Sequence, residues 1–486
     1  MASELPTGLL SAAARFPTAE AVVTSQRIYT YTDLTGLIRQ SVASLKRQGF
    51  GPHERVATLV RNDVREIVLL HALWQLGAVV VPLSHRFPAP VVREYVSELG
   101  CVGLVCDSTQ ADDPQLPELR RLALSEVVDL RLDGNDKVDS ADRPIDNRPA
   151  TIMLTSGSSG RHKAVVHSLA NHAHSALSSN TNLPLGPGDR WLLSLPLNHV
   201  GGLAVLFRAA LAGAAVAVPD SGVDLRESIV TLRPTHLSLV ATQLKRLLSR
   251  PLDNTVCSHL KAVLVGGGPL AVDLMERGSA LGLPVVATYG CTEMASQIAT
   301  GRLDDHKQPS LSSGRALEFC NLTIADDGEI WVCGKQLCLG YMECGEVNSV
   351  TDAEGWFHTG DLGRLDPEGY LTVLGRKDDM FISGGENIYP AQIEAALFSH
   401  GGIEDAVVIA LEDETFGHRP AAIMKLAPGP VPTREALAGF LSDHLPAYML
   451  PVRYFAWPCG PGETALKPNR IALTRQAMTG ELPEIT

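Results

Sequence analysis

The chain has 486 residues, which is more than one hydrophobic core normally supports, so its length predicts two or more domains. Apolar residues make up 45% and charged residues 20%, a composition typical of an ordinary globular protein. With 41 Lys and Arg against 54 Asp and Glu, the net charge is −13, which argues against nucleic-acid binding and attachment to anionic membranes. An anionic ligand would therefore need a local site.

The opening residues MASELPTGLLSAAARF lack a basic region, so we expect no signal peptide. The longest apolar stretch, residues 67–83, is interrupted by His71, Trp74 and Gly77 and predicts a buried helix that runs into a strand. Nine cysteines without framework spacing indicate reduced thiols. Together these features predict a cytoplasmic protein without membrane insertion.

Short apolar runs alternate with helical patterns in the first part of the chain. IYTYTDL predicts a strand that enters a helix over 34–47, and RVATLV, AVVVPLS and CVGLVCD predict further strands, with a helix over 90–99. This alternation is typical of parallel sheets built from βαβ units. Residues 107–148 are acidic and proline-spotted, so we expect loops and edge elements there.

The alternation returns at residue 151, where WLLSLPL, AVAVPD, THLSLV, KAVLVGG and VVATYG predict strands separated by helix-length segments. Residues 311–374 change to short strands with turns at ADDGEI, DAEGW and DPEGY, which indicates a small β-rich module.

The pattern changes again after GRKDD at 375–379. Pro390 stands at a favourable first helical position, EDAVVIAL predicts a strand, and TREALAGFLSDHL predicts an amphipathic helix with Leu437, Phe440 and Leu441 on one face. We therefore predict an α/β protein with two domains. A large N-terminal domain, 1–377, would hold parallel-rich sheets flanked by helices plus the β module, and a mobile α+β domain would span 378–486.

The segment TSGSSGRHK, residues 155–163, has the composition of a flexible linker. A Walker phosphate loop needs a lysine directly after its second glycine, whereas Arg161, His162 and Lys163 follow Gly160. The strand-like residues before it and the helical pattern HSLANHAHSALS after it disfavour a linker. Backbone N–H groups, hydroxyls and the Lys163 charge together indicate an anion-binding nest.

Partner motifs follow this segment in one order: LPLNHVGG at 195–202, GGGPL at 266–270, YGCTE at 289–293, HTGDLG at 358–363, GRKDDMFISGGENIYPAQIE at 375–394, and Lys467. Each motif is weak alone, but the ordered set resembles the acyl-adenylate-forming superfamily of acyl-CoA synthetases, adenylation domains and luciferases over essentially the whole chain. The resemblance implies that a carboxylate reacts with ATP to give acyl-AMP and pyrophosphate, and that a thiol then displaces AMP. ATP, Mg²⁺ and coenzyme A are the implied cofactor and co-substrates.

The resemblance also implies roles for residues in these motifs. The triphosphate would be held by Thr155, Ser156, Gly157, Ser158, Ser159, Gly160 and Lys163. Glu293 would bind Mg²⁺, which favours oxygen ligands, and Thr292 would contact the AMP phosphate. Adenine would lie among Gly266, Gly267, Gly268, Tyr289 and Gly290, and the ribose would bind Asp361 with Arg376 nearby. Taken alone, Glu293 would be a surface carboxylate and Asp361 a turn residue.

Lys467 resembles the late lysine that contacts both the substrate carboxylate and the α-phosphate, where it would offset charge in the transition state. Leu466 replaces the usual glycine before it, and Arg470 keeps its place three residues on. In the first motif, His162 and Ala164 replace the usual proline and glycine. By the same resemblance Asp378 would be the hinge of a rotating small domain, which would bring Gly384 and Gly385 to the thiol channel.

His199 would line the acyl pocket, with Asn198 where an aromatic residue is usual. SLPLNHVGGL with Arg208, FGHRPAAIM and PVRYFAWP resemble the o-succinylbenzoate–CoA ligases of menaquinone biosynthesis. That acid carries two carboxylates, so a cation such as Arg208 would suit its pocket. Arg208 could instead extend to solvent from a helix end.

Other functions stay open at this point. Another aryl or short-chain acid–CoA ligase would share the motifs, and a freestanding adenylation protein would load a carrier protein instead of CoA. A pseudoenzyme would be expected to lack Glu293 or Lys467, and both are present. The expected partners are a small carboxylic acid, ATP and CoA, and the sequence leaves open whether the chain forms a homo-oligomer.

Overall fold

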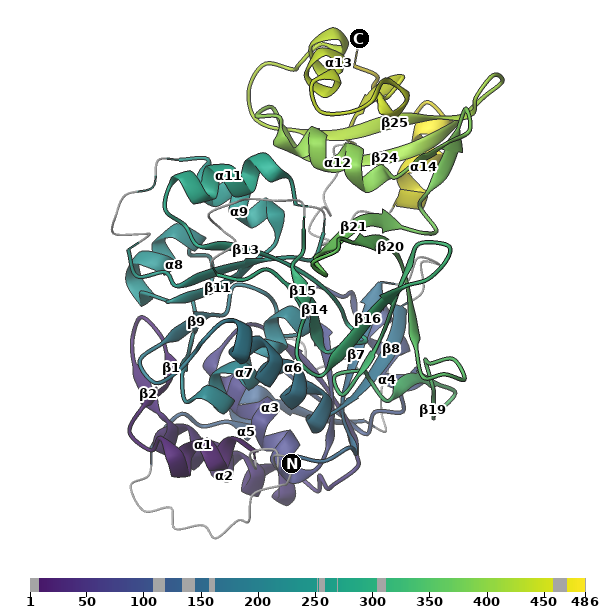
Figure 1. Ribbon diagram of the computed structural model, residues 1–486. Coiled ribbons are helices and arrows are strands. Elements are labelled where there is room, and N and C mark those ends of the chain that lie inside the picture. The colour runs from purple at the N-terminus through teal and green to yellow at the C-terminus, as the bar shows by residue number, and fades with distance from the viewer. Residues whose placement is uncertain are drawn as a thin grey trace.

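The computed structural model describes residues 8–107, 119–132, 145–156, 162–250, 252, 258–268, 270–303, 312–457 and 470–485. Two large mixed sheets with helices packed on them fill most of the molecule, and a small three-stranded sheet with its own helices lies at one end (Figure 1). The expected α/β fold with parallel-rich sheets is confirmed.

The described helices are α1 Gly8–Arg15, α2 Tyr31–Arg47, α3 Val64–Leu76, α4 Ala89–Glu98, α5 Leu124–Val127, α6 Leu169–Asn182, α7 Val200–Ala212, α8 Leu225–Leu232, α9 Ala241–Leu248, α11 Val272–Ala280, α12 Pro390–Ser399, α13 Arg434–Ser442 and α14 Arg470–Met478. None of these helices is long and apolar enough to cross a membrane.

The first large sheet has eight strands in the order β19-β18-β8-β7-β4-β3-β5-β6. Their bounds are β3 Arg55–Val60, β4 Val79–Ser84, β5 Gly103–Cys106, β6 Arg120–Ala123, β7 Pro149–Ser156, β8 His162–Ser168, β18 Gly340–Glu343 and β19 Glu346–Asn348. The strands from β7 to β6 run parallel, whereas β7 and β8 form an antiparallel hairpin. The apolar stretch at 67–83 forms most of buried α3 and most of β4, as predicted.

The second large sheet has nine strands in the order β15-β14-β13-β12-β11-β9-β10-β1-β2. They are β1 Glu20–Val23, β2 Ile28–Thr30, β9 Arg190–Leu192, β10 Ala215–Ala217, β11 His236–Leu239, β12 Ala262–Val265, β13 Val285–Cys291, β14 Ser296–Thr300 and β15 Arg315–Ala316. Neighbours from β13 to β1 are parallel, and their side chains form a continuous apolar layer.

WLLSLPL forms only the short strand β9, not a strand along its whole length. The side-chain amide of Asn62 donates to the carbonyls of Leu193 and Leu195 and accepts from the amide of Leu197. A side chain therefore takes the hydrogen bonds that a neighbouring strand would otherwise supply.

Helix α2 begins at Tyr31, three residues before the predicted start. Thr30 and Asp33 form a capping box in which the Thr30 side chain accepts from the Asp33 amide and Asp33 accepts from the Thr30 amide, at 3.1 and 2.8 Å. This cap places the strand-like IYT directly before the helix.

The β-rich region is an antiparallel sheet in the order β16-β17-β20-β21. Its strands are β16 Cys320–Ile324, β17 Glu329–Gly334, β20 Phe357–Leu365 and β21 Leu371–Arg376. It leads into the hairpin of β22 Phe381–Ser383 and β23 Glu386–Ile388. The final sheet consists of β24 Ile403–Asp413, β25 Gly417–Leu426 and β26 Arg453–Ala456.

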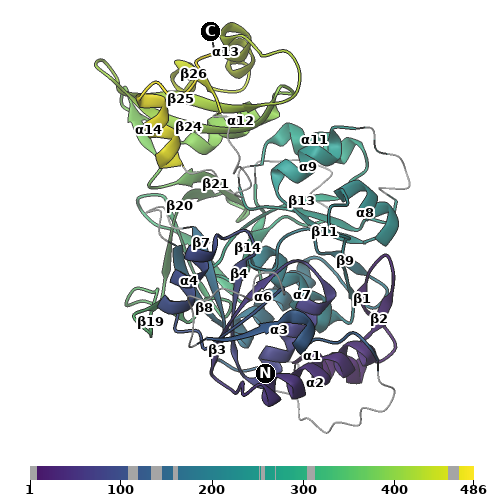
Figure 2. The same ribbon diagram turned by 180° about the vertical axis from the view of Figure 1, so that it is seen from behind.

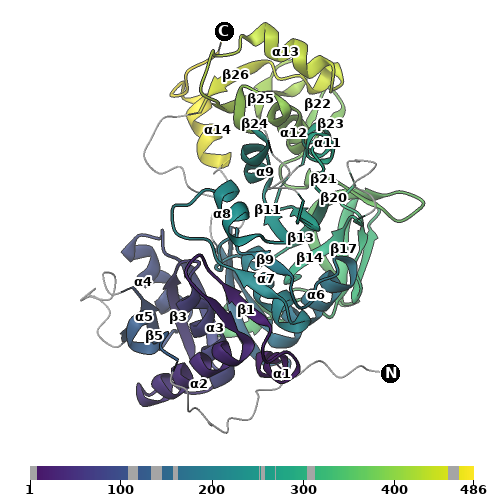
Figure 3. The ribbon, with the colours of Figure 1, turned by 90° about the vertical axis from the view of Figure 1, so that its left-hand side faces the viewer.

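This C-terminal module has its own core, which includes Ile393, Leu397, Val408, Leu437 and Leu441. The module lies beyond the ends of β20 and β21, and α12 faces α9 and α11 of the larger body (Figures 2 and 3). Phe398 of α12 is buried in the apolar cluster that α9 and α11 form with the second sheet.

Candidate active site

The TSGSSGRHK segment begins at the end of β7 and ends at the start of β8. Thr155 pairs with Lys163 and Ser156 with His162 across this hairpin. His162 is held by its Nδ1, 2.9 Å from the Thr155 carbonyl oxygen, and lies beside the rings of Phe87 and Tyr95. The tip, Gly157, Ser158, Ser159, Gly160 and Arg161, lies outside the described residues.

Tyr341 contacts both Lys163 and Glu293 and thereby connects them. The sequence analysis did not identify this tyrosine. The Lys163 Nζ lies 4.8 Å from the centre of the Tyr341 ring, and the Tyr341 hydroxyl donates to Glu293 Oε1 at 2.7 Å. Burial, followed by the Glu293 charge, raises the pKa of Tyr341 and keeps it protonated. Tyr341 lies in short β18, where neither spacing nor composition marks it.

Thr292 and Glu293 lie in the turn that joins β13 to β14. The ring Nε2 of His167 lies 2.8 Å from the Thr292 carbonyl oxygen, and the amide of Cys338 donates to the Glu293 carbonyl at 2.7 Å. Gly290 is required just before the turn, because a Cβ there would lie 1.8 Å from the carbonyl oxygen of Ser296.

Three residues assigned to the nucleoside meet at one place. The Tyr289 hydroxyl donates to Asp361 Oδ2 at 2.6 Å, and Arg376 Nη1 donates to Asp361 Oδ1 at 3.1 Å. Asp361 and Arg376 are paired across β20 and β21. Burial, with a smaller effect of Asp361, raises the pKa of Tyr289. The arrangement leaves a carboxylate, partly exposed and held by two donors, at the surface of this sheet.

The three glycines Gly266, Gly267 and Gly268 follow β12, beside β13. A Cβ at Gly266 would lie 2.6 Å from Cγ2 of Thr288, so only glycine lets the two strand ends approach this closely. Gly267 has φ +82°, a conformation that also favours glycine.

His199 occupies the N-cap position of α7 without a side-chain capping hydrogen bond, and it is exposed, whereas Asn198 is half-buried. The loop before α7 is tightly folded: a Cβ at Gly202 would lie 2.2 Å from the Pro196 carbonyl oxygen. Asn62 holds the same loop from α3's side and is a second residue that the motif search did not identify.

Arg208 lies in the middle of the buried face of α7 and is only 1% exposed, so it does not extend to solvent. Its Nη2 donates to Ser296 Oγ at 3.1 Å, and its Cζ lies 4.9 Å from the ring centre of Trp191. In the part of the chain that the structure describes, its Nε has no hydrogen-bond partner and no carboxylate forms an ion pair with it. Burial lowers the pKa of this guanidinium to about 9.

The C-terminal residues assigned by resemblance are only partly described. Asp378 lies 3.9 Å from Arg376 between carboxylate and guanidinium atoms. Gly384 and Gly385, with φ +58° and +91°, form the two-residue turn between β22 and β23. Lys467 lies outside the described residues, as does the whole of 458–469.

Arg470 begins α14 three residues after Lys467 and is firmly held. Its guanidinium pairs with Glu394 at 2.8 Å and with Asp379 at 3.5 Å, and it donates to the Val408 carbonyl. Arg470, the first described residue after 458–469, is therefore fixed to the C-terminal module.

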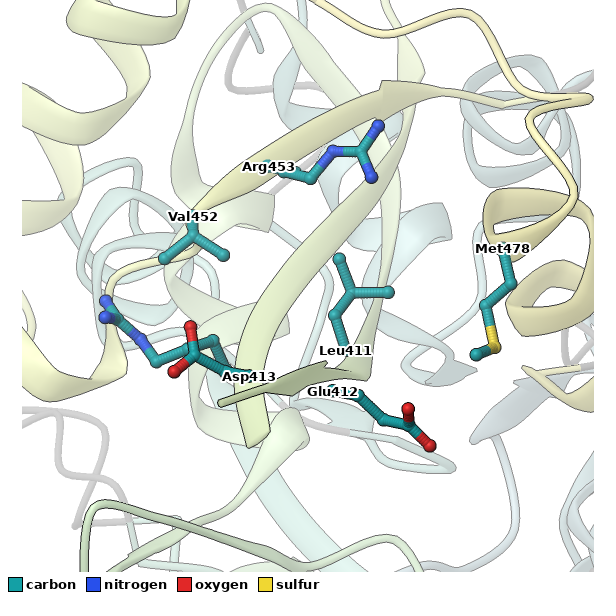
Figure 4. Close-up of a pocket in the computed structure, with 7 residues that line it drawn as sticks. Leu411, Glu412, Asp413, Val452, Arg453 and Met478 are labelled. Atoms are coloured by element: carbon teal, nitrogen blue, oxygen red, sulfur yellow. The ribbon is translucent and has the colours of Figure 1, made fainter. Parts of the chain in front are cut away.

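A separate hollow lies on the C-terminal module between β24, β26 and α14 (Figure 4). Its lining includes Asp413, Arg419 and Arg453, and Arg453 is already paired with Glu484 at 2.6 Å. No residue with an assigned catalytic, nucleotide-binding or acid-binding role lines it, although Arg419 belongs to the FGHRPAAIM run and Arg453 to the PVRYFAWP run. In the described part of the chain, no three His, Cys, Asp or Glu side chains converge as a metal site.

The motif residues therefore form two groups. One group offers the Lys163 ammonium and the Glu293 carboxylate, both in contact with Tyr341, which suits a phosphate and a hard cation. The other group offers the buried guanidinium of Arg208 on α7, which suits a second anionic group. Such a site is typical of an enzyme that activates an acid with a nucleotide.

Comparison with known proteins agrees with this class. The family model described as AMP-binding enzyme matches residues 9–342, and the one described as AMP-binding enzyme C-terminal domain matches residues 392–458. This chain belongs to the AMP-binding enzyme family. Because its relatives are CoA ligases, this chain is an AMP-forming acid–thiol ligase.

One relative is the 2-succinylbenzoate–CoA ligase of Bacillus pumilus, 34% identical over 92% of this chain and 93% of its own. The o-succinylbenzoate CoA synthetase of Bacillus subtilis, in complex with the acyl-adenylate intermediate OSB-AMP, is 30% identical with a TM-score of 0.85, covering 97% of this chain and 98% of its own. The same enzyme in complex with ATP and magnesium ion also has a TM-score of 0.85 at 30% identity, covering 97% of this chain and 100% of its own.

Proposed function

We propose that this ligase converts 2-succinylbenzoate to its CoA thioester and ATP to AMP and pyrophosphate. A carboxylate oxygen of the succinyl arm attacks the α-phosphorus, and the bond to the departing pyrophosphate breaks. The CoA sulfur then attacks the acyl carbon, its proton is lost, and AMP leaves with the electron pair of the acyl C–O bond. The names of the Bacillus relatives support this substrate.

The observation that carries the choice of acid is the buried guanidinium of Arg208. A buried cation without a carboxylate partner is costly, and an anion bound beside it recovers much of that cost. The ring carboxylate of 2-succinylbenzoate is such an anion, whereas a fatty acid or benzoate would leave Arg208 unpaired after its only carboxylate had reacted.

ATP would be held by the groups around the β7–β8 hairpin and β13. Lys163 and the 155–160 nest would bind the β- and γ-phosphates, Thr292 the α-phosphate, and Asp361 the ribose hydroxyls. Glu293 suits Mg²⁺ because its carboxylate oxygen is a hard ligand and lies near Lys163, the lysine proposed to bind the phosphates. Bound Mg²⁺ would offset the negative charge of the phosphates.

The C-terminal module would complete each half-reaction. Lys467 would neutralise charge between the acid and the α-phosphate, and the Gly384–Gly385 turn would border the CoA thiol after rotation about Asp378. This assigns 1–377 to the acid and nucleotide and 378–486 to the mobile domain. The anchoring of Arg470 supports movement of Lys467 together with that module.

The test is incubation with ATP, Mg²⁺, CoA and single acids, with pyrophosphate and thioester scored by mass. We expect turnover of 2-succinylbenzoate and little turnover of benzoate or hexanoate. Turnover of benzoate or hexanoate but not of the diacid would contradict the proposal. Thioester on a carrier protein but none on CoA would instead favour an adenylation protein.

A further inference from the structure

The turn that carries Thr292 and Glu293 is held in a conformation that its own residues disfavour. Ala295 has φ 52° and Ser296 has φ 134°, both in the region that favours glycine. A strained turn of this kind persists only where its surroundings hold it.

Three donors from outside the turn bind its carbonyl groups. They are His167 Nε2 to Thr292 at 2.8 Å, the Cys338 amide to Glu293 at 2.7 Å, and Ser175 Oγ to Ala295 at 3.1 Å. A carbonyl oxygen only accepts, so His167 carries its hydrogen on Nε2.

We propose that His167 is a positioning residue for the ATP site, and that its hydrogen bond orients the peptide between Thr292 and Glu293 so that both side chains face the phosphates. This inference rests on the roles proposed for Thr292 and Glu293. The carbonyl that His167 binds belongs to the same rigid peptide plane as the Glu293 amide. Rotation of that plane would turn the side-chain directions of both residues.

His167 also joins two parts of the nucleotide site. It lies on β8 with Lys163, four residues away and therefore on the same side of the strand. Lys163 contacts the Tyr341 ring, and the Tyr341 hydroxyl binds Glu293 in the turn. His167 binds the turn directly, at the Thr292 carbonyl. Strand β8 therefore carries Lys163 and also supports the turn with Thr292 and Glu293.

A buried histidine can also be simple core filling. His167 is fully buried, and its ring centre lies 4.9 Å from that of His172. Among the described residues its Nδ1 has no hydrogen-bond partner, so this ring is costlier to bury than an apolar side chain of the same size. An imidazole would fill the core no better than an apolar side chain. The hydrogen bond to Thr292 is therefore the contact that accounts for a histidine at position 167.

The test compares His167→Gln, His167→Asn and His167→Leu. A glutamine amide reaches about as far as Nε2, an asparagine amide only as far as Nδ1, and leucine fills the space without a donor. We expect Asn and Leu to weaken MgATP binding and kcat/KM for adenylation about 10- to 100-fold, as typical for residues that orient a metal ligand. Gln should restore most of both. Thioester formation from supplied acyl-adenylate should fall less than adenylation, because it keeps the Thr292 contact with the α-phosphate but needs no contact with Mg²⁺ and pyrophosphate.

His172→Leu is the matched control, because His172 is buried beside His167 and, among the described residues, its Nε2 has no hydrogen-bond partner. It should lose a similar amount of thermal stability while its MgATP affinity stays that of the parent. Equal losses of MgATP affinity in His167→Leu and His172→Leu, or in the Gln and Asn variants, would overturn the inference. MgATP affinity is measured by calorimetry without an acid, so a parent enzyme inactive on 2-succinylbenzoate would contradict the proposed substrate and leave this comparison intact.

Discussion

At the scale of single residues, Arg208 combines full burial, a pKa lowered to about 9 by that burial, and no carboxylate partner among the described residues. Its contacts with Ser296 Oγ and the Trp191 ring satisfy it only in part. Bidentate recognition of a carboxylate is the contact for which a guanidinium is best suited.

Arg208→Gln should raise KM for 2-succinylbenzoate about 10- to 100-fold, the loss of about 1.5–3 kcal/mol expected for a hydrogen bond to a charged group. KM for ATP should rise much less, because Arg208 reaches the turn that carries Thr292 and Glu293 only through the Ser296 hydroxyl. Arg208→Lys keeps the charge but loses the bidentate geometry. Its KM for 2-succinylbenzoate should therefore lie between that of the parent and that of Arg208→Gln. Steady-state kinetics in both substrates measure this, and an equal rise in both KM values would refute the assignment.

Sequence motifs predicted candidate residues for this site but not the contacts between them. Tyr289, Asp361 and Arg376 belong to separate motifs, and the structure joins them by hydrogen bonds. Tyr341 and Asn62 lie outside every motif, and their importance arises only from side chains far away in the chain. Local sequence carries no information about such pairs.

At the scale of elements, α9 holds the C-terminal module through Lys245. Its ammonium donates to the carbonyls of Phe398, His400 and Ile403, which include the last turn of α12, and it lies 4.3 Å from the Phe398 ring centre. The Phe398 carbonyl belongs to the last turn of α12, where carbonyls have no partner within the helix, so the lysine caps α12 from another part of the molecule. Burial lowers the pKa of Lys245 to about 8.

Lys245→Met should loosen this contact and make amide hydrogen exchange in α12 and the following turn about tenfold faster or more, given about 1.5–3 kcal/mol for a charged hydrogen bond. Arg246→Met is the control, because Arg246 is exposed on the same helix. Hydrogen exchange followed by mass spectrometry distinguishes them. Unchanged exchange in Lys245→Met would show that apolar packing of Phe398 alone holds the module.

The element types were largely predictable, whereas their ends and pairings were not. Parallel βαβ units follow from alternating apolar runs, and α12 begins at Pro390 as predicted. The antiparallel β7–β8 hairpin was not predicted, because the choice of partner strand depends on contacts across the sheet. The capping box at Thr30 and Asp33 was visible in the sequence and would have corrected the start of α2.

At the scale of the whole molecule, several histidines are buried in the neutral state. Burial lowers the pKa of His71 to about 3 and of His167 and His236 to about 4, and it lowers that of His172 strongly, from an ordinary value of 6.5. Between pH of about 4 and 6.5 the unfolded chain binds protons at these positions and the folded chain does not.

The free energy of unfolding should therefore fall as pH is lowered through this window, by about 1.4 kcal/mol per pH unit for each such group at most. Urea unfolding at pH of about 7.5 and about 5 measures the difference. His172→Phe should be less sensitive to acid, since it removes one of the protons taken up on unfolding. A parent protein equally stable at both pH values would contradict this prediction.

The reaction itself admits a direct test of the account as a whole. The enzyme is given ATP, Mg²⁺, CoA and 2-succinylbenzoate labelled with ¹⁸O in the carboxylate of the succinyl arm, and the products are weighed by mass spectrometry. Because the carboxylate oxygen becomes the bridge of the acyl-adenylate and leaves with AMP, we predict one ¹⁸O in AMP, one in the thioester, and none in pyrophosphate. Unlabelled AMP, or formation of ADP with labelled phosphate, would contradict an adenylate mechanism for this chain.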